Sequence, residues 1–332
     1  MDKEKLYMPE TGLDNILIFT PYYKTVIWGG RRIADLKKEE IGVDNLGESW
    51  EISAIPGHES IVASGKFAGR TIQSLIAEYG ETFLGKKVVD LYGDEFPLLL
   101  KFIDAHRDLS LQVHPSDQLA KERHNSRGKV EMWYVVDADR DAKIYCGLKA
   151  SLTPADYRVK TDNKTIMDVV KVHDSHQGQA YVIPPGTLHA IGEGNLVAEV
   201  QESSDITYRV YDYDRYDSGG KPRALHTDLA IDAIDYTYPK EIHPTAYTFE
   251  GTEIEAVKCR YFTVDYLEID GEGLHFECDG QSFVCLMVVG GKVKVTADGE
   301  VRELTIGHSA LIPASVAKLD IEGSGRVLKV YI

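Results

Sequence analysis

One histidine stands at a turn whose composition would fix its direction. His189 follows the run GQAYVIPPGT, in which residues 181–183 have the character of a buried strand and Pro184 and Pro185 restrict the backbone. Gly186 supplies a turn that a residue with a Cβ would resist. The imidazole of His189 is therefore predicted to point in one direction. Because histidine is the commonest metal ligand in proteins, partners for it deserve a search along the chain.

Three upstream residues could complete a metal site with His189. In LSLQVHP, Gln112 and His114 lie two residues apart in a strand-like run, so both side chains project from one face. In GKVEMWYV, Lys129 and Glu131 share a face in the same way. Each of these residues also has an ordinary structural interpretation, such as a hydrogen-bonded histidine before a proline. Together, Gln112, His114, Glu131 and His189 form a nitrogen and oxygen donor set for one divalent ion per chain, with zinc expected.

Charged residues on neighbouring strands could face the same cavity. Glu199 shares a strand face with Val197 and Gln201, and Arg209 shares one with Thr207 and Tyr211, because successive side chains alternate. The alternative is a structural ion pair between Glu199 and Arg209. Lys101 interrupts the apolar run 96–105, so it either reaches an edge of the sheet or points at an anionic ligand.

Composition limits the partners and the compartment. The 332 residues are 43% hydrophobic and 27% charged, as in ordinary soluble proteins, but the formal charge is -16. This charge argues against nucleic acid and anionic membranes as partners, since both attract basic proteins. The N-terminus is charged and the chain has no apolar run of membrane-spanning length, so we expect a cytoplasmic protein. The four cysteines form no CxxC pair, which indicates reduced thiols.

The pattern along the chain predicts strands and turns with a few short helices. Short runs of β-forming residues, separated by glycine or proline, fill residues 15–64 and 247–332. Helices are predicted where the spacing is helical or a capping residue stands first: 71–80, 116–124, 153–159 and 228–236. The run 239–245 is expected to link two domains.

A short internal sequence repeat suggests that the two domains are related. GQAYVIPPGTLH at residues 178–189 and GHSALIPASVAK at 307–318 both place a proline six residues after the first glycine. Lys318 stands where the first copy has His189. We therefore expect two related β-barrels, a catalytic one in residues 1–240 and a structural one without metal in residues 241–332.

The stretch GQAYVIPPGTLH fits the second sequence motif of the cupins, and the chain as a whole resembles the type I mannose-6-phosphate isomerases in their short bacterial form. The resemblance rests on WGG at residues 28–30, ESWEIS, LSLQVHP, GKVEMWYV, PPGTLHAI and ITYRVYDYDR. It implies a mainly β fold of two cupin, or jelly-roll β-barrel, domains with a few short helices. The first cupin motif departs from the general pattern because Gln112 replaces the first histidine, and the isomerases share that glutamine.

The resemblance also assigns roles to residues. It implies that Gln112, His114, Glu131 and His189 bind a catalytic zinc and that Arg209 belongs to the active site. It further implies that the remaining candidates face the substrate: Lys101, Ser110, Lys129 and Glu199. Arg209 could contact either the phosphate or the reacting oxygens, and the sequence does not choose between them.

The expected activity is interconversion of mannose 6-phosphate and fructose 6-phosphate through an enediolate. Zinc would act as a Lewis acid, and Glu199 would transfer the carbon-bound proton. One alternative is another metal-dependent bicupin such as an iron oxygenase, although the donor set is not the usual two histidines and one carboxylate. A second alternative is a sugar-binding cupin without activity. The partner is expected to be a small sugar phosphate, and the protein a monomer or homodimer.

Overall fold

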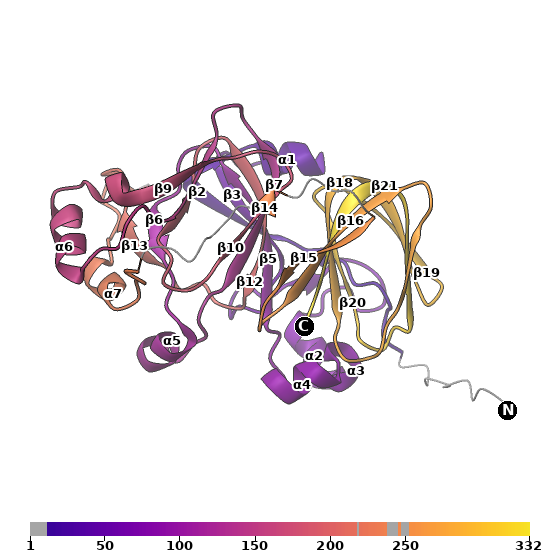
Figure 1. Ribbon diagram of the computed structural model, residues 1–332. Helices are drawn as coiled ribbons and strands as arrows, with labels where there is room; N and C mark the ends of the chain where they lie inside the picture. The colour runs from indigo at the N-terminus through magenta and orange to yellow at the C-terminus, as the bar shows by residue number, and fades with distance from the viewer. Residues whose placement is uncertain (1–11, 218, 238–244, 247–251) are drawn as a thin grey trace. The chain divides into compact units, whose positions relative to one another are not determined.

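The computed structural model describes residues 12–217, 219–237, 245–246 and 252–332. The chain is mainly β with few helices, as predicted, and it divides into two compact units (Figure 1). The first unit comprises residues 21–58 and 97–246, and the second comprises residues 12–20, 59–96 and 252–332, within the described parts of the chain. Residues 59–96 thus group with the C-terminal residues, whereas the sequence predicts one boundary near residue 240. The predicted link at 239–245 lies outside the described residues except for Thr245.

Two antiparallel sheets build the first unit. The larger sheet contains seven strands in the order β14 (Thr245–Ala246), β10 (Gln179–Ile183), β7 (Glu131–Ala138), β12 (Asn195–Glu202), β5 (Leu98–Ala105), β3 (Leu46–Ile52) and β2 (Tyr22–Gly30). The smaller sheet contains five strands in the order β13 (Tyr208–Tyr211), β6 (Leu111–Val113), β11 (His189–Ile191), β8 (Lys143–Leu148) and β9 (Val170–Asp174).

The two sheets of the first unit share one hydrophobic core. Trp133 and Val135 of β7 pack in the same buried cluster as Ile144 and Cys146 of β8 and Ile191 of β11. These side chains recur at every second residue, so each strand turns one face to the core. Glu131 lies two residues before Trp133 on β7, which places its carboxylate at the end of the same buried face.

Helices of the first unit begin at the capping residues that the sequence indicates. Ser116 caps α5 (Asp117–His124), and Thr153 forms a capping box at the start of α6 (Pro154–Asp162). The helix predicted for 228–236 is shorter: α7 spans Thr227–Ile231. It ends early because the amide of Asp235 donates to the carbonyl of Gly186, 2.9 Å away, which draws the chain out of the helix. Two further short elements were not predicted from the sequence: α1 (Arg32–Lys37) and the 3-10 helix at Ile166–Val169.

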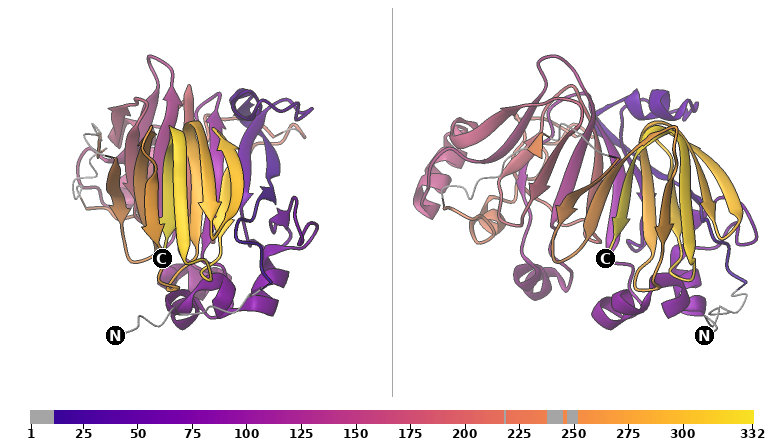
Figure 2. Two further views of the ribbon diagram at one scale, coloured as in Figure 1. Left: turned by 90° about the vertical axis from the view of Figure 1, so that its right-hand side faces the viewer. Right: turned by 45° about the vertical axis from the view of Figure 1, so that its right-hand side comes forward.

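The second unit contains one large antiparallel sheet and three helices. The sheet runs β15 (Glu253–Lys258), β16 (Thr263–Asp270), β21 (Lys318–Tyr331), β18 (Val284–Ala297) and β19 (Glu300–Thr305), with β17 (Leu274–Glu277) paired to β21 and β20 (Ser309–Ile312) to β18 (Figure 2). The strands β1 (Phe19–Thr20) and β4 (Ile61–Val62) form a separate antiparallel pair in this unit. The predicted helix at 71–80 is confirmed as α2 (Ile72–Tyr79), and α3 (Glu81–Leu84) and α4 (Lys86–Tyr92) follow it.

The described helices are short, and none is long and apolar enough to cross a membrane. The caps of α2 illustrate why the prediction succeeded there. The Thr71 hydroxyl accepts from the Ser74 amide at 3.2 Å, and Gly80 ends the helix with a positive φ of 49°. Ile72, Leu75 and Ile76 form its buried face.

Candidate metal centre and active site

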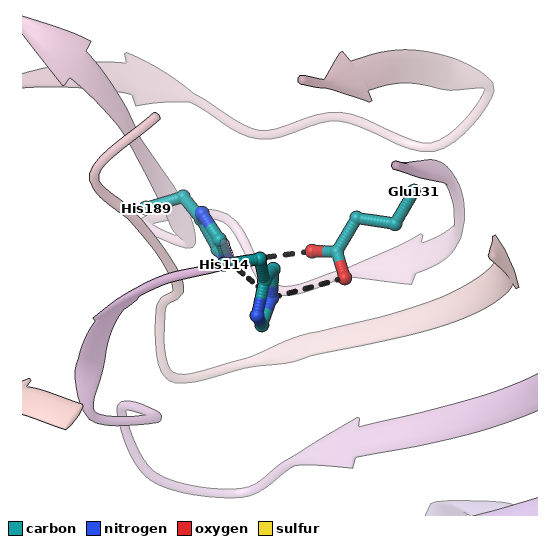
Figure 3. A group of neighbouring side chains, drawn as sticks. All are labelled: His114, Glu131 and His189. Carbon is teal, nitrogen blue, oxygen red and sulfur yellow. Dashed lines mark hydrogen bonds and ion pairs between the residues drawn. The ribbon is translucent and has the colours of Figure 1, made fainter. Parts of the chain in front are cut away.

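Three side chains of the first unit converge on one point. His114, Glu131 and His189 are buried, and each offers a ligand atom within 4.8 Å of the others (Figure 3). Glu131 opens β7, His189 opens β11, and His114 follows the end of β6. All three therefore lie at strand ends, where a regular sheet fixes the backbone and leaves the side chains free to meet.

The turn before His189 is built as the sequence predicts. Gly186 has φ of +85°, the left-handed region that favours glycine, and its amide donates to the carbonyl of His114 at 3.0 Å. His189 then lies directly opposite Gln112 across β11 and β6. One turn thus ties together three of the four predicted ligands.

Hydrogen bonds fix which nitrogen of each histidine is available. The Nδ1 atom of His114 donates to the carbonyl of Ile206 at 2.9 Å, and that of His189 to the carbonyl of Thr187 at 2.8 Å. Both Nε2 atoms are then left without a proton, and they face each other at 3.1 Å. Two lone pairs at that distance repel unless a cation lies beside them. Nζ of Lys129 lies 3.3 Å from Nε2 of His114, and a metal ion between the two nitrogens would relieve the repulsion more fully, so this geometry fits a cation site.

Glu131 completes the centre with both carboxylate oxygens. Its Oε1 lies 3.3 Å from Nε2 of His189, and its Oε2 lies 3.3 Å from Nε2 of His114 and 2.8 Å from Nζ of Lys129. Burial alone would raise the pKa of Glu131, but Lys129 and the two histidines outweigh it and hold that pKa well below its usual range. The carboxylate is charged and ready to coordinate a cation.

Burial lowers the pKa values of both histidines. The pKa of His114 falls to about 4, chiefly through burial and then through the nearby Lys129 charge, and burial also lowers the pKa of His189. Both rings are neutral near pH 7, as metal ligands must be. Gln112 is the fourth predicted ligand, and its amide lies 3.3 Å from Nε2 of His189. A half turn of that amide would present its carbonyl oxygen instead.

A cavity of about 350 Å³ adjoins the centre. Its lining contains Gln112 together with every predicted substrate-facing residue. The full lining is Lys24, Val26, Trp28, Glu48, Trp50, Lys101, Ile103, Leu109, Ser110, Gln112, Lys129, Trp133, Ile191, Glu199, Asp205, Thr207, Arg209 and Arg223. Five of these side chains are cationic and three are anionic, in a chain whose formal charge is -16. The local excess of positive charge suits an anionic ligand.

Lys101 and Glu199 form a buried ion pair in this wall. Nζ of Lys101 lies 2.8 Å from Oε2 of Glu199 and 3.7 Å from Oε2 of Glu48. Burial alone would lower the pKa of Lys101, but the two carboxylates outweigh it and raise that pKa. Trp133 donates from Nε1 to Oε1 of Glu199 at 3.0 Å, which fixes the carboxylate's orientation. Lys101 therefore does not reach a sheet edge, and the ion-pair partner of Glu199 is Lys101, not Arg209.

Glu48 is a buried carboxylate to which the sequence pattern gave no role. Trp50 donates from Nε1 to its Oε2 at 2.7 Å, and Lys24 approaches its Oε1 at 3.2 Å. Burial alone would raise the pKa of Glu48, but Lys101, Lys24 and the Trp50 hydrogen bond lower it to about 2. The alternation in ESWEIS places Glu48 and Trp50 on one face, which is the only sequence signal for this position.

Arg209 and Arg223 both line the cavity. Nη1 of Arg209 donates to the carbonyl of Ala224 at 2.8 Å, while its buried Nε has no hydrogen-bond partner among the described residues. Arg223 is held by the buried Asp212, whose two oxygens each lie 3.1 Å from Nη1. Arg223 follows an irregular loop without periodicity, so sequence reasoning had no signal for it.

The prediction that Thr207, Arg209 and Tyr211 share one strand face is confirmed only in part. Thr207 and Arg209 both line the cavity, as alternation predicts. The register of β13 against β6 shifts between Arg209 and Tyr211, and this irregularity ends the alternation. Tyr211 is therefore not among the residues that line the cavity.

Comparison with known proteins identifies the family. The model "Phosphomannose isomerase type I, catalytic domain" matches residues 16–140, and "Mannose-6-phosphate isomerase, cupin domain" matches residues 252–332. Mannose-6-phosphate isomerase ManA of Bacillus subtilis is 34% identical over 318 residues, covering 92% of this chain and 96% of its own. Mannose-6-phosphate isomerase of Streptococcus mutans is 33% identical over 311 residues, covering 91% of this chain and 93% of its own.

A solved structure agrees with these matches. The crystal structure of the mannose 6-phosphate isomerase from Bacillus subtilis superposes with a TM-score of 0.85 at 33% identity, covering 96% of this chain and 100% of that one. His114 and Glu131 lie within the residues that match the catalytic-domain model. On this evidence, the chain belongs to the type I mannose-6-phosphate isomerases, as the motifs of its sequence indicate.

Proposed function

We propose that the chain interconverts mannose 6-phosphate and fructose 6-phosphate at the cavity beside His114, Glu131 and His189. The single observation that carries the proposal is a buried metal-ligand set at the wall of a cavity with excess positive charge. An anionic sugar with two reacting oxygens needs both features.

Zinc is the metal that this donor set favours, one per chain. His114, Glu131 and His189 would hold it, with Gln112 as the fourth ligand, because nitrogen and oxygen donors of this kind suit zinc. The facing Nε2 atoms support that fit, as does the buried Oε1 of Glu131, which accepts no hydrogen bond from the described residues and lies 3.3 Å from Nε2 of His189. When bound, zinc would polarise the substrate's C1 and C2 oxygens as a Lewis acid.

Arg209 and Arg223 would bind the phosphate. Both line the cavity. The segment after Arg223 holds Arg209 through the carbonyl of Ala224 and through Nδ1 of His226, which accepts from the Arg209 amide at 3.0 Å. Burial, and then the repulsion from Arg223, lowers the pKa of Arg209, so an anion between the two guanidinium groups relieves an unfavourable arrangement. Guanidinium groups also match phosphate oxygens in geometry.

Glu199 would move the carbon-bound proton. It would accept the proton from C2 of the aldose and return it to C1 of the ketose, while the hydroxyl proton passes from O2 to O1. Lys101 and Trp133 orient its carboxylate by the contacts described above. Lys101 and Lys129 would offset the negative charge of the enediolate, and the Ser110 hydroxyl would contact the sugar.

Two other functions remain as alternatives from different classes. An iron oxygenase would need open positions beside two histidines and one carboxylate, and here Gln112 lies beside that set. A sugar-binding protein without activity would not need the oriented Glu199 beside a buried lysine. The observed charges favour the isomerase over both.

We also propose the domain organisation, the compartment, the oligomeric state and the partners of the protein. The chain would comprise two cupin barrels, a catalytic one mainly within residues 1–240 and a C-terminal one in residues 241–332 without metal. The protein would act in the cytoplasm on a small sugar phosphate, as a monomer or homodimer, without nucleic-acid or membrane partners. The negative net charge supports the last point.

A coupled assay tests the proposed function. Purified protein is supplied with mannose 6-phosphate, and fructose 6-phosphate is detected through a coupling enzyme. We expect product with zinc-loaded protein, loss of product after chelation, and recovery when zinc is returned. Absence of fructose 6-phosphate with zinc-loaded protein, or formation unaffected by chelation, would contradict the proposal.

A further inference from the structure

The C-terminal unit repeats the turn that aims His189. Gly178 and Gly307 both have φ of +87°, and their amides donate at 2.9 Å to the carbonyls of Val135 and Val288. Each glycine precedes a short strand that ends five residues later, β10 at Ile183 and β20 at Ile312. The sequence repeat at residues 178–189 and 307–318 is therefore also a structural repeat, and positions in the two units can be matched.

The turns end alike, but the metal ligands are replaced. The next strand opens with His189 in the first unit and with Lys318 in the second. Ile183 lies opposite Glu131, and its counterpart Ile312 lies opposite Val284. A lysine and a valine thus stand where the first unit has two metal ligands.

The strand register matches a second pair of positions in the two units. Two residues beyond Glu131, Trp133 lies opposite Glu199, and two beyond Val284, Leu286 lies opposite Lys329. Lys329 therefore occupies the position of Glu199. Across the next strand, Glu199 lies opposite Lys101, and Lys329 lies opposite Asp265.

The C-terminal unit keeps the buried ion pair with its charges exchanged. Nζ of Lys329 lies 2.9 Å from Oδ2 of Asp265, where the first unit places Lys101 beside Glu199. A further carboxylate joins in both units: Glu253 lies 3.2 Å from Nζ of Lys329, at the register position that Glu48 has in the first unit. A packed interior would not require this polar cluster, because apolar side chains of similar volume stabilise a core at least as well.

A cavity of about 410 Å³ adjoins this cluster: Lys329 lines it, whereas Asp265 and Glu253 are not among its lining residues. Aromatic rings flank the ammonium group, with Nζ of Lys329 4.0 Å from the centre of Phe276 and 5.3 Å from that of Tyr331. Lys87 is the other cation of the lining, and Glu277 and Asp279 are its anions. The lining thus has two cations and two anions, and Lys329 already pairs with two further carboxylates, so the cavity has no excess positive charge to attract a phosphate.

We infer that this cavity is a second binding site, for a neutral polyhydroxylated ring such as an unphosphorylated hexose. Hydroxyl groups both donate and accept, so they can bind the Lys329 ammonium and the Glu277 and Asp279 carboxylates of the lining together. The apolar face of a sugar ring would pack on Phe276. The exchanged charges thus separate the two cavities by ligand: the first takes a sugar phosphate, and the second takes the uncharged sugar.

Calorimetric titration of the full, zinc-loaded chain with unphosphorylated mannose tests the inference. The active site is kept occupied by a saturating equilibrium mixture of mannose 6-phosphate and fructose 6-phosphate. We expect mannose to bind with a Kd on the order of 1 mM, since a ligand with few atoms has little contact area. Phe276→Leu should weaken binding about tenfold, because it removes the aromatic face but keeps an apolar side chain.

A double variant tests the ion pair. Asp265→Leu with Lys329→Met replaces both charges with apolar groups, which leaves no unpaired charge from the pair and should preserve folding. We expect it to abolish mannose binding while its thermal transition stays cooperative. Glu303→Gln serves as the control, because this exposed side chain of β19 lines neither cavity and its loss should leave mannose affinity unchanged.

Three results would overturn the inference. They are the absence of mannose binding in the wild type, displacement of mannose by the sugar phosphates, and equal mannose affinity in the wild type, Phe276→Leu and the double variant. Failure of the isomerase assay would be a separate result, because this titration does not depend on turnover.

Discussion

At the scale of single residues, the active-site wall consists of charged groups that the fold has buried in pairs. Glu199 is oriented by Lys101 and Trp133, so the residue proposed to transfer the proton has little freedom to turn. The sequence placed Glu199 and Arg209 on strand faces but could not decide their partners. Partners depend on which strands are neighbours, and pairing between strands far apart in the sequence is not a local property.

Glu199→Gln tests the proton-transfer role. The amide cannot accept the C2 proton, so kcat should fall by about 10² to 10⁴ while zinc content stays the same. The matched control is Glu202→Gln, a buried glutamate of the same strand whose carboxylate accepts from the Val130 amide. Steady-state kinetics and metal analysis of both variants make the comparison. Near-normal kcat with a lowered thermal transition would assign Glu199 a structural role, and Lys129 would become the next candidate.

The depressed pKa of Glu48 predicts a specific dependence of stability on pH. Its folded value of about 2 lies below its ordinary value of 4.5, so its contribution is complete above pH 4.5 and is lost as the pH falls toward 2. Between about pH 6 and about pH 3, the wild type should lose about 2 kcal/mol more of its free energy of unfolding than Glu48→Gln. Urea titrations at the two pH values measure this difference. Parallel losses in the two proteins would show that Lys101 and Lys24 do not stabilise the charged form.

At the scale of elements, the sequence predicted those parts that depend on local chemistry. The caps at Thr71, Ser116 and Thr153 and the left-handed glycine at residue 186 are each set by one side chain and its neighbours. The sequence could not predict where α7 ends, because a hydrogen bond to a distant carbonyl ends it.

The functional site shows the same division between local and distant information. His114, Glu131 and His189, the three predicted ligands that converge in the structure, each stand in a short motif at a strand end, which is why local sequence could indicate them. Arg223 was missed because its loop has no periodicity and its position depends on the buried Asp212. The grouping of residues 59–96 with the C-terminal unit was missed for the same reason, since it depends on contacts far along the chain.

A glycine substitution tests whether the turn before His189 positions that histidine. Gly186→Ala adds a Cβ that meets the Ala233 carbonyl oxygen at 3.0 Å, at a φ of +85° that alanine disfavours. We expect a loss of about 1–3 kcal/mol in the free energy of unfolding, together with weaker zinc binding, because the histidine is no longer aimed. Gly57→Ala is the matched control: its φ is +82°, but its Cβ meets nothing within 4 Å. If both variants bind zinc as tightly as the wild type, the turn at Gly186 is not needed to position His189.

At the scale of the whole molecule, charge separates the catalytic cavity from the rest of the surface. The formal charge of -16 disfavours binding to nucleic acids and anionic surfaces, whereas five cationic and three anionic side chains line the cavity proposed to receive the sugar phosphate. The two units repeat one turn and one ion-pair position, yet only the first contains the converging metal ligands among the described residues. Duplication of a barrel would therefore have left one active site and one cavity with exchanged charges.

Metal content and turnover of His189→Ala, measured on the same sample, test whether activity depends on one metal ion held by His189. Exposed His124 on α5 provides the control, His124→Ala. We expect about one zinc per chain in the wild type and in the control, and almost none in His189→Ala. The kcat of His189→Ala should fall by at least about 10², because the ion supplies several kcal/mol of stabilisation in the transition state. Stoichiometric zinc with wild-type turnover in His189→Ala, or close to two zinc ions per wild-type chain, would contradict these expectations.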